Sequence, residues 1–463
     1  MQDPLLASLP VAVTGGDFDA VRELVAASRT KIVVLDDDPT GTQTMHGIDV
    51  LADWSVEALR AALADPRPCF YILTNTRSMP AAEASALALE VAVNLSKAAK
   101  GLGVRFTVIS RSDSTLRGHF AAELEALEQG LDWAVDAKIV VPAFFEGGRY
   151  TIHGIHYVAE GGRLVPAAQT EFARDRTFGY SHSRLADWIE EKTGGRTRAV
   201  DVASVDISIL RARDGAERVR RQLLDLPRGS FVAVNAASYQ DLEVFTHGML
   251  LAEAEGRRYL ARSAASFVRV RAGLEPRALL APTELGSGGT GGGLVIVGSY
   301  ISKTTAQIHS LLTLANAEPI EVMVDRLAQP GARSAEIARA ATAATSAMRA
   351  GHHAVVFTSR ALVSALGAAG DLRAGRIVSD SLVAIARSIP DRPRFLVAKG
   401  GVTSCDIAIR GLGMHRALVL GQAAAGVPVW EMGPETRFPG LRYVVWPGNV
   451  GGPDGMRDLI RPL

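Results

Sequence analysis

The sequence predicts an α/β fold of two domains, each a mainly parallel sheet flanked by helices. Short apolar runs alternate with stretches rich in Ala, Leu and Glu, a pattern typical of parallel strands connected by helices. The length of 463 residues exceeds what one hydrophobic core usually supports. A glycine-rich interruption then divides the pattern into two parts. We therefore expect a domain on each side of it, with the active site in the cleft between them.

The first half contains several apolar runs with the length of buried parallel strands. In chain order these are residues 31–35, 69–73, 106–109, 139–141 and 231–234. Residues 81–99 and 121–127, which lie between them, have the apolar spacing and composition of helices. These elements form the predicted amino-terminal domain, residues 1–284.

The glycine-rich segment, residues 285–293, is predicted to be a linker or mobile loop, because such a backbone is costly to hold in one conformation. Gly286, Gly288 and Gly291 have the spacing of a dinucleotide fingerprint. That fingerprint follows a strand and opens a helix, whereas this segment precedes a strand, which favours the linker. Strand-like runs resume at 294–297, 354–357, 395–398 and 427–430, so residues 294–463 are predicted to form the second α/β domain.

The composition is that of a soluble globular protein. Hydrophobic residues make up 48%, and 50 Lys and Arg balance 49 Asp and Glu. The basic residues are scattered, which disfavours nucleic-acid binding. No signal peptide is visible and no apolar run approaches ~18 residues, which disfavours secretion and membrane insertion. The chain contains 2 cysteines, too few for a disulfide framework, so we expect a cytoplasmic protein.

Three consecutive carboxylates, Asp36, Asp37 and Asp38, follow the first strand-like run. Their mutual repulsion is usually offset by a cation, an arginine or substrate hydroxyls. We therefore expect Asp37 and Asp38 to bind a ligand and Asp36 to be structural. The alternative for Asp38 is a cap on the turn formed by Pro39, Thr40 and Gly41.

Two further strand ends carry arginines and an aspartate. Arg77, Arg111 and Arg117 can each bind a carboxylate through two hydrogen bonds, and Asp113 can accept a hydrogen bond or a proton from a sugar hydroxyl. Together they predict a site for an acid that carries hydroxyls. A structural salt bridge is the alternative for any single arginine. The predicted substrate-binding set is Asp37, Asp38, Arg77, Arg111, Ser112, Asp113, Ser114 and Arg117.

Two histidines, His153 and His156, lie close together but have no carboxylate or cysteine at a metal-binding spacing. We expect them to be hydrogen-bonded in a polar loop, and the sequence identifies no metal ligands.

In the second half, residues 298–304 and 399–404 each follow a strand-like run. The first segment lacks the glycine that precedes the lysine in a P-loop, but its backbone N–H groups and hydroxyls suit phosphate. In the second, paired glycines permit close backbone approach, and Thr403 and Ser404 are expected to cap the next helix. A simple turn before a capped helix is the alternative. Residues 446–452 form another glycine-containing loop.

With these motifs in order, the chain resembles the four-carbon acid sugar kinase family, once catalogued as a domain of unknown function, over nearly its whole length. Residues 37–41 resemble the family's Asp-Asp-x-Thr-Gly motif, and residues 111–118 resemble its Asp-Ser-Thr-Leu-Arg-Gly segment. Residues 141–144 and 148–149 resemble its Pro-Ala-Phe and Gly-Arg elements. Gly154 and Asp175 also match the family pattern.

The resemblance implies a kinase whose amino-terminal domain binds a sugar acid and whose carboxyl-terminal domain binds ATP, with Mg²⁺ as cofactor. Threonate, erythronate and 3-oxo-tetronate are the family's substrates. The longer amino terminus, the third aspartate, residues 42–44 and Arg111 in place of a common lysine depart from the family pattern. These departures leave the substrate open, related oxo acids such as 3-oxo-isoapionate included. The implied ATP-binding set is Ser299, Lys399, Gly400, Gly401, Val402, Thr403, Ser404, Gly448 and Gly451.

The catalytic candidates are Asp37 and Asp113, either of which would orient the acceptor hydroxyl and take its proton. A non-catalytic sugar-acid sensor is one alternative, which binding without ADP production would favour. An oxidoreductase or isomerase of sugar acids is another, which NAD binding without ATP binding would favour. The sequence leaves the oligomeric state open, a homodimer being one arrangement that it permits.

Overall fold

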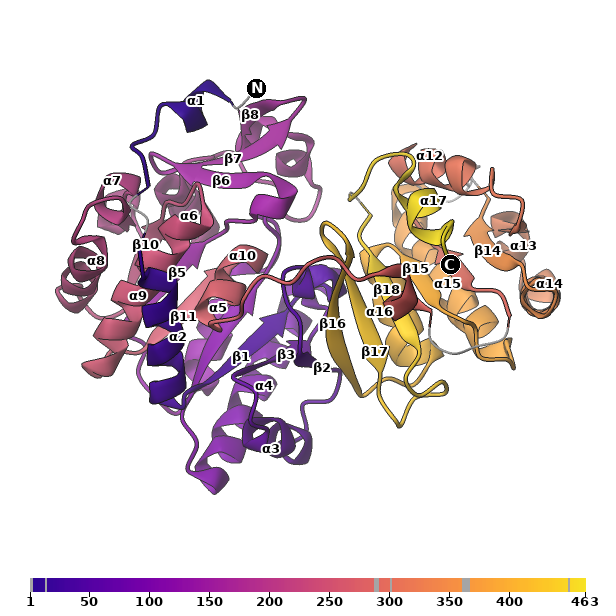
Figure 1. The fold of residues 1–463 in the computed structure, drawn as a ribbon, viewed down its shortest axis with the longest axis horizontal. Coiled ribbons are helices and arrows are strands. Elements are labelled where there is room, and N and C mark those ends of the chain that lie inside the picture. Colours follow the sequence, from indigo (N-terminus) through magenta and orange to yellow (C-terminus); the bar gives the residue numbers. More distant parts are fainter. Residues whose placement is uncertain (1–2, 13–14, 287–290, 300–301, 360–366, 449) are drawn as a thin grey trace. The chain divides into compact units, whose positions relative to one another are not determined.

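The computed structural model describes residues 3–12, 15–286, 291–299, 302–359, 367–448 and 450–463. The packing of the chain divides it into two compact units, each described here by itself. Unit 1 comprises Met1–Gly41 and Asp53–Pro276, and unit 2 comprises Thr42–Ala52 and Arg277–Leu463. Helices flank a mainly parallel sheet in each unit (Figure 1), which confirms the predicted class of two α/β domains.

The sheet of unit 1 is parallel between all of its neighbouring strands. Their order across the sheet is β3 (Cys69–Leu73), β1 (Lys31–Asp36), β4 (Phe106–Arg111), β11 (Tyr259–Ser263), β5 (Ala137–Val141), β10 (Ser230–Val234) and β9 (Ala203–Val205). Strands β1, β3, β4, β5 and β10 coincide with the predicted apolar runs. The sequence pattern does not reveal β11, because Arg262 interrupts its apolar residues.

Two groups of helices cover this sheet. Helices α4 (Ala81–Leu102) and α5 (Phe120–Gly130) lie in the crossovers from β3 to β4 and from β4 to β5, which run in one direction across the sheet. Helix α9 (Tyr239–Ala254) lies in the crossover from β10 to β11, which runs in the other direction. Right-handed crossovers therefore place α9 on the opposite face. Helix α3 packs beside α4, and α2 and α8 pack beside α9. The helices of unit 1 are α1 (Pro4–Ala7), α2 (Asp17–Ser28), α3 (Val56–Ala64), α4 (Ala81–Leu102), α5 (Phe120–Gly130), α6 (Leu185–Lys192), α7 (Ile207–Leu210), α8 (Gly215–Leu224), α9 (Tyr239–Ala254) and α10 (Ala265–Arg271).

Helix α4 illustrates how the sequence specifies these elements. Its buried residues Ala84, Ala88, Val91 and Leu95 recur at helical spacing and form one apolar face. The helix ends at Gly103, whose φ of 66° is the left-handed conformation that commonly terminates helices.

A small antiparallel sheet follows β5 in the chain. It consists of β6 (Arg149–Ile152), β7 (Ile155–Glu160) and β8 (Arg163–Pro166). His153 and Gly154 connect β6 to β7 with φ values of 51° and 76°, as a two-residue type I′ turn requires. Backbone bridges from Phe144 to Arg149 and from Thr151 to Ala236 attach β6 to the carboxyl ends of β5 and β10.

The sheet of unit 2 is parallel at one side and antiparallel at the other. Its order is β13 (Ala317–Val322), β14 (His353–Thr358), β12 (Leu294–Val297), β15 (Leu396–Lys399), β18 (Arg442–Trp446), β17 (Val427–Met432), β16 (Arg416–Ala424) and β2 (Ile48–Leu51). Pairing is parallel from β13 to β18 and antiparallel from β18 to β2.

The helices of unit 2 are α11 (Pro282–Leu285), α12 (Ser302–Leu311), α13 (Val324–Ala328), α14 (Pro330–Arg349), α15 (Gly367–Ser388), α16 (Gly401–Asp406) and α17 (Gly455–Ile460). A π-helical turn, Ile407–Gly411, continues α16.

Strand β2 comes from the amino-terminal part of the chain but belongs to unit 2. Its residues pair with β16 from Leu51 opposite Arg416 to Ile48 opposite Val419. Upstream of β2, the hydroxyl of Thr42 accepts a hydrogen bond from Trp430 Nε1 at 3.0 Å. The chain thus passes between the units after residues 41, 52 and 276.

The described part of the predicted linker, residues 285–293, packs with unit 2. Leu285 is buried in its hydrophobic core, and the backbone N–H of Gly292 donates to the Met348 carbonyl. A side chain on Gly293 would overlap the Phe395 ring. The crossing between the units therefore precedes this segment. Residues 287–290 lie outside the described residues.

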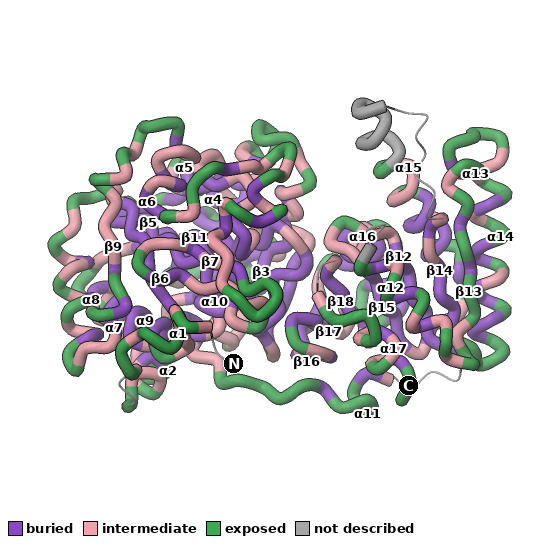
Figure 2. Tube along the Cα trace, turned by 90° about the horizontal axis from the view of Figure 1, so that it is seen from above, coloured by how far each residue is buried: buried purple, intermediate pink, exposed green. Residues whose placement is uncertain are grey.

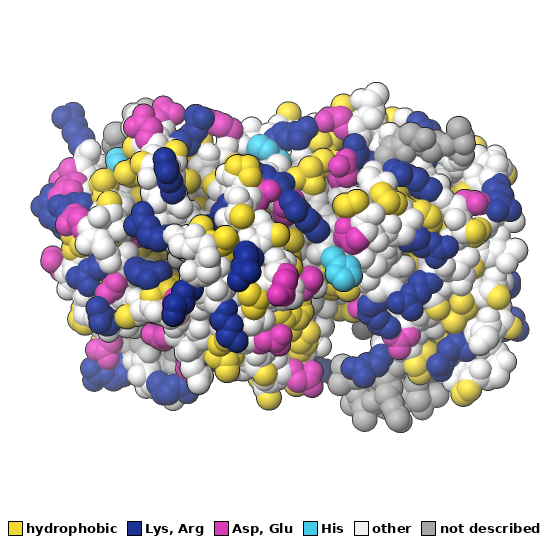
Figure 3. All heavy atoms as spheres, turned by 90° about the horizontal axis from the view of Figure 1, so that it is seen from below, with side chains coloured by type: hydrophobic (Ala, Val, Ile, Leu, Met, Phe, Trp, Pro, Cys, Tyr) yellow, Lys and Arg dark blue, Asp and Glu magenta, His cyan; other side chains and the backbone are white. Residues whose placement is uncertain are grey.

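Burial follows the strands in both units (Figure 2). On the face shown in Figure 3, basic and acidic side chains are interspersed. In the ranges that the structure describes, no helix is long and apolar enough to cross a bilayer.

Candidate functional site

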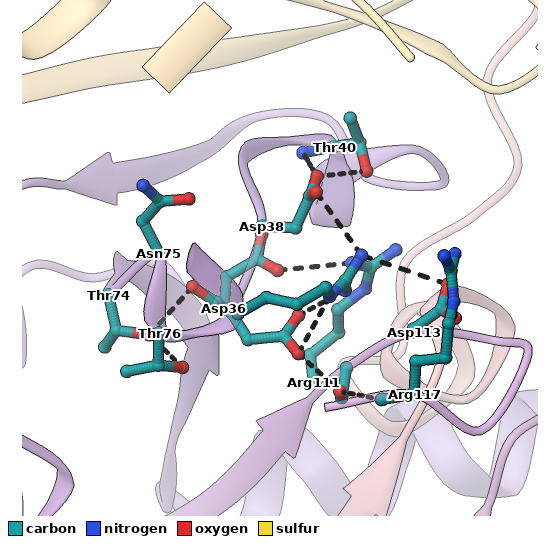
Figure 4. A network of polar contacts seen from close by, with 12 residues as sticks. Asp36, Asp38, Thr40, Thr74, Asn75, Thr76, Arg111, Asp113 and Arg117 are labelled. Atoms are coloured by element: carbon teal, nitrogen blue, oxygen red, sulfur yellow. Dashed lines mark hydrogen bonds and ion pairs between the residues drawn. The ribbon is translucent and has the colours of Figure 1, made fainter. Parts of the chain in front are cut away.

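The candidate site of unit 1 is built at the carboxyl edge of its sheet. The strand register places Asp36 opposite both Leu73 and Arg111, and Arg111 opposite Ser263. The loops that follow β1, β3 and β4 therefore leave the sheet side by side. Ligands of open α/β sheets bind at this edge. Figure 4 shows the polar network that these loops form.

Arg77 lies at the centre of the network. Its guanidinium is 2.5 Å from Asp37 Oδ1, 3.3 Å from Asp38 Oδ2 and 3.9 Å from Asp113 Oδ1. Burial disfavours its charge, yet the three carboxylates raise the pKa of Arg77 above its ordinary value. The arginine therefore offsets the repulsion of the clustered aspartates, as the sequence predicts for such a cluster.

Asp37 and Asp38 have both oxygens engaged. Asp37 Oδ2 accepts hydrogen bonds from Arg77 Nε at 3.2 Å and from the Ser112 hydroxyl at 2.5 Å. Asp38 Oδ1 accepts from the backbone N–H and the hydroxyl of Thr40. Burial alone would favour the protonated form of Asp38, but Arg77 and Thr40 lower its pKa. Asp38 thus caps the turn and also pairs with Arg77.

Asp36 and Arg111 are buried partners, with Arg111 Nη1 donating to Asp36 Oδ1 at 3.3 Å. Burial raises the pKa of Asp36 to about 8 despite this pairing. The Asp36 carbonyl also accepts hydrogen bonds from Thr74 and Asn75, which fixes the adjoining loop. Asp36 is structural, and Arg111 is engaged by it.

Asp113 has remaining capacity to accept a hydrogen bond. Its Oδ2 accepts from Arg117 Nε at 2.7 Å and from the Thr115 hydroxyl. Arg77 Nη1 lies 3.9 Å from its Oδ1, and in the described chain Oδ1 accepts no hydrogen bond. Burial would raise the pKa of Asp113, but Arg117 and Arg77 hold it far below its usual range. The group is therefore a carboxylate with one oxygen available.

A second layer of buried charges, which sequence reasoning missed, supports Ser112. Arg262 on β11 donates to the hydroxyls of Ser110 and Ser112 and lies 3.4 Å from Glu123 on α5. Gly118 packs against this layer, and a Cβ atom on residue 118 would stand 2.7 Å from Ser112 Oγ. Its φ of 110° also favours glycine. Two features of the sequence could have identified this layer: an arginine within an apolar strand and a glutamate on the apolar face of a helix.

Ser114 is held through its backbone. Its carbonyl accepts a hydrogen bond from His156 Nε2 at 2.7 Å, and His156 Nδ1 lies 3.0 Å from the Thr151 hydroxyl. Burial lowers the pKa of His156 to about 4, so the ring is neutral at physiological pH. His156 is therefore hydrogen-bonded as expected, but it is buried on strand β7 and does not lie in a polar loop. His153 is exposed in the β6–β7 turn.

In unit 2, the loops after β12 and β15 touch at the carboxyl edge of the parallel strands. A Cβ on Gly298 would stand 2.2 Å from Thr403 Oγ1, and Gly400 has φ of 108° close to Ser299. The Ser299 hydroxyl lies 3.0 Å from that of Thr304. Tyr300 and Ile301, in the same predicted loop, lie outside the described residues. The structure thus brings Ser299, Gly400 and Thr403 together.

Lys399 is fully buried, and its Nζ donates to the carbonyls of Pro447 and Gly448 at 2.9 and 3.1 Å. Burial, with Lys303 adding to it, lowers the pKa of Lys399 to about 7. Gln307 donates to the carbonyls of residues 450–452, and its Nε2 would be 3.3 Å from a Cβ on Gly451. These two side chains hold the loop that contains Gly448 and Gly451. Asn449 lies outside the described residues.

The predicted cap of the next helix differs in the structure. Helix α16 starts at Gly401, and its N-cap residue, Gly400, makes no side-chain hydrogen bond. Thr403 and Ser404 therefore lie inside the helix, where the Ser404 hydroxyl donates to the Ala398 carbonyl. Val402, between them and Gly401, is half exposed. The cause is that the two glycines let the chain turn into the helix earlier than the hydroxyl residues.

Among the described residues, no group of three or more His, Cys, Asp and Glu side chains is arranged to hold a metal ion. The clustered aspartates of unit 1 are instead neutralised by arginines.

Comparisons with known proteins also divide the chain into two parts, each with its own binding domain. Residues 32–271 match the sugar-binding N-terminal domain family, and residues 294–456 match the nucleotide-binding C-terminal domain family. Comparison with curated proteins gave no match.

The first two of the following solved structures share the fold. A Salmonella typhimurium LT2 protein, provisionally assigned as a tRNA synthase, is 17% identical with a TM-score of 0.66, covering 94% of this chain and 98% of its own. A Haemophilus influenzae protein of the DUF1537 family is 16% identical with a TM-score of 0.61, covering 93% and 99%. A Bordetella bronchiseptica DUF1537 protein with bound citrate, a domain-swapped dimer, is 22% identical with a TM-score of 0.38, covering 92% and 97%.

Proposed function

Because this chain belongs to the four-carbon acid sugar kinase family, DUF1537, we propose that it transfers the terminal phosphate of ATP to a hydroxyl of a small sugar acid. The substrates we propose are threonate, erythronate, 3-oxo-tetronate or a related oxo sugar acid. In this reaction the hydroxyl oxygen forms a bond to phosphorus, the bond between that phosphorus and ADP breaks, and the hydroxyl proton is released.

The observation that carries the proposal is the available oxygen of Asp113. It lies at the carboxyl edge of the sheet in the sugar-binding unit, and Arg117 and Arg77 keep the group ionised. Because the group stays ionised, its available oxygen can accept the hydrogen bond of a substrate hydroxyl. Phosphoryl transfer depends mainly on such positioning and on charge neutralisation.

The other residues of unit 1 then have distinct roles. Asp37 holds Arg77 and Ser112, so its effect on the reaction is through the geometry of the loops. Arg111 is committed to Asp36, which favours the structural alternative for this arginine. Among the two catalytic candidates, the available oxygen favours Asp113 over Asp37.

ATP is proposed to bind the loops of unit 2 that contain Ser299, Gly400 and Gly448. The absence of side chains on Gly298 and Gly400 lets these loops approach Thr403 and Ser299 closely, while the N–H groups of the two glycines donate to the carbonyls of Lys399 and Trp446. Lys399 and Gln307 would fix the carbonyl-rich loop from inside. We propose that Mg²⁺ enters with the nucleotide and neutralises phosphate charge.

The test is release of ADP by the purified protein with ATP and Mg²⁺ across the threonates, erythronates and 3-oxo acids. Acid-dependent ADP release that disappears in Asp113→Asn, purified in the same way, would support the proposal. ATP binding without ADP release for any acid would contradict the kinase and favour the sensor. Mass spectrometry of the phosphorylated product would identify the substrate.

A further inference from the structure

Arg149 is an arginine of the sugar-binding unit that lies outside the network of paired charges. It is the first residue of β6, and its backbone exchanges hydrogen bonds with Phe144 at 2.8 and 3.2 Å. Phe144 follows β5, so this bridge fixes Arg149 at the carboxyl edge of the main sheet. That is the edge at which Asp113 and Arg117 lie.

The Phe172 ring joins Arg149 to Arg117. The Arg117 guanidinium carbon is 5.1 Å from the ring centroid, and that of Arg149 is 5.8 Å from it. Both guanidiniums thus lie within cation–π distance of the same aromatic ring. The charges that act most strongly on Arg149 are Asp113 and Arg117, which places it beside the proposed acceptor-hydroxyl site.

The two arginines that contact Phe172 differ in their carboxylate partners. Arg117 lies 2.7 Å from Asp113 and 3.5 Å from Asp175. Arg77, Arg111 and Arg262 are also each within 4 Å of a carboxylate. Arg149 forms no ion pair within the described part of the chain.

The hydrogen-bonding capacity of Arg149 is also mostly unused. Its Nη1 donates to the Gly147 carbonyl, and its buried Nε has no acceptor among the described residues. A guanidinium has five donors, and Nη2 makes no hydrogen bond to a described residue. The residue is partly buried. A partly buried cation without a counterion is costly unless a ligand supplies the negative charge.

We propose that Arg149 binds the carboxylate of the sugar acid, while Asp113 accepts the hydrogen bond of the hydroxyl that receives phosphate. The inference rests on the proposed function, and it identifies the residue that makes the site specific for acids. Arginine suits this role because its planar donors match a carboxylate, and the Phe172 ring lies against the guanidinium. An uncharged polyol would leave the cation unpaired and would bind more weakly.

The test compares acids with their uncharged analogues by calorimetry in the absence of ATP. Threonate and erythronate are titrated into wild type, Arg149→Gln and Arg149→Lys, and threitol and erythritol are titrated in parallel. The matched control is Arg163→Gln, on β8 of the same small sheet, where the side chain is exposed. Thermal unfolding verifies that each variant is folded.

We expect Arg149→Gln to raise the Kd of the acid roughly 10- to 100-fold, as for loss of a hydrogen bond to a charged group. The Kd of the alditol stays unchanged, so the preference for acid over alditol collapses. Arg149→Lys retains part of the preference, and Arg163→Gln behaves as wild type.

Acid binding by the wild type that Arg149→Gln retains, with its preference over the alditol, would overturn the inference alone. Acid binding that needs Arg149 but gives no ADP release would overturn the kinase and leave the inference standing. Absence of binding of both acids to the wild type would overturn the inference, and it would restrict the proposed kinase to the oxo acids.

Discussion

Gly41 lies so close to the carboxylate of Asp36 that a Cβ atom on residue 41 would stand 1.9 Å from Asp36 Oδ2. The carboxyl group is buried and accepts a hydrogen bond from Arg111, so it cannot move aside without breaking that contact. Glycine at this position is therefore required by packing, because a close approach leaves no room for a side chain.

Gly41→Ala is expected to destabilise the protein by roughly 1–3 kcal/mol, the usual cost of overpacking a buried site. Displacement of the adjoining Asp37–Asp38 loop should weaken acid binding as well. The measurement is the midpoint of thermal unfolding together with the Kd of the acid. Gly331→Ala in the first turn of α14 is the control, since nothing lies within 4 Å of a Cβ there. Equal effects of the two substitutions would contradict the packing argument.

Asp113→Asn should lower kcat by roughly 100-fold or more, because the available oxygen no longer belongs to a carboxylate. Asp37→Asn should instead lower the unfolding midpoint, since Arg77 and Ser112 lose their common partner. Steady-state kinetics and thermal unfolding of both variants separate these effects. The control is Asp201→Asn, which removes only an exposed ion pair with Arg198. If Asp37→Asn alone abolished turnover in a stable protein, the assignment of roles would be reversed.

Stability should fall between pH 6.5 and 4 through His156. Burial lowers the pKa of its ring in the folded state to about 4, while the unfolded state keeps an ordinary pKa near 6.5. The unfolded state therefore binds the proton first, and the folded state loses roughly 3 kcal/mol over this range. Above pH 6.5 this contribution is fully present.

Unfolding midpoints measured from pH 7.5 to 4.5 check this expectation. His156→Gln should have a flatter profile than wild type, although it is less stable at pH 7 because Ser114 and Thr151 lose a partner. His153→Asn, in the exposed turn, should leave the slope unchanged, as asparagine tolerates the positive φ there. A His156→Gln profile as steep as that of wild type would assign the slope to other groups.

Lys399→Met should weaken ATP binding about tenfold and leave acid binding unchanged. Methionine preserves the length of the buried side chain, but the carbonyls of Pro447 and Gly448 lose their donor, so the loop is released. Calorimetric titration of ATP and of the acid into the same preparation supplies its own control. Unchanged ATP affinity would place the nucleotide away from this loop.

The fold was accessible from the sequence to the extent that buried strands are continuous apolar runs. Strand β1 shows this, since every residue from Lys31 to Asp36 is buried. The partner of β2 was not accessible, because Ile48–Leu51 is short and pairs with a strand near the other end of the chain. Local pattern contains no information on which distant strand completes a sheet.

The same limit applies to the site. Clustered charges at strand ends predicted Asp37, Asp38, Arg77, Asp113 and Arg117, and the structure brings them into one network. Isolated charges such as Arg262 and Glu123 escaped prediction because each lies alone in an apolar element. Which arginine is neutralised, and which remains for a ligand, depends on side-chain placement that spacing does not reveal.

The membership of β2 in unit 2 has a consequence for how the protein can be divided. A fragment that starts at Arg277 would lack the strand that pairs with β16, and the edge of that strand would present unpaired N–H and C=O groups. Such an edge recruits other strands, so this fragment should aggregate or exchange strands between copies. Supplying residues 42–52 as a separate peptide should restore solubility. The nucleotide-binding half is therefore not encoded by one continuous stretch of sequence, and it cannot be separated from the other half by cutting the chain at one position.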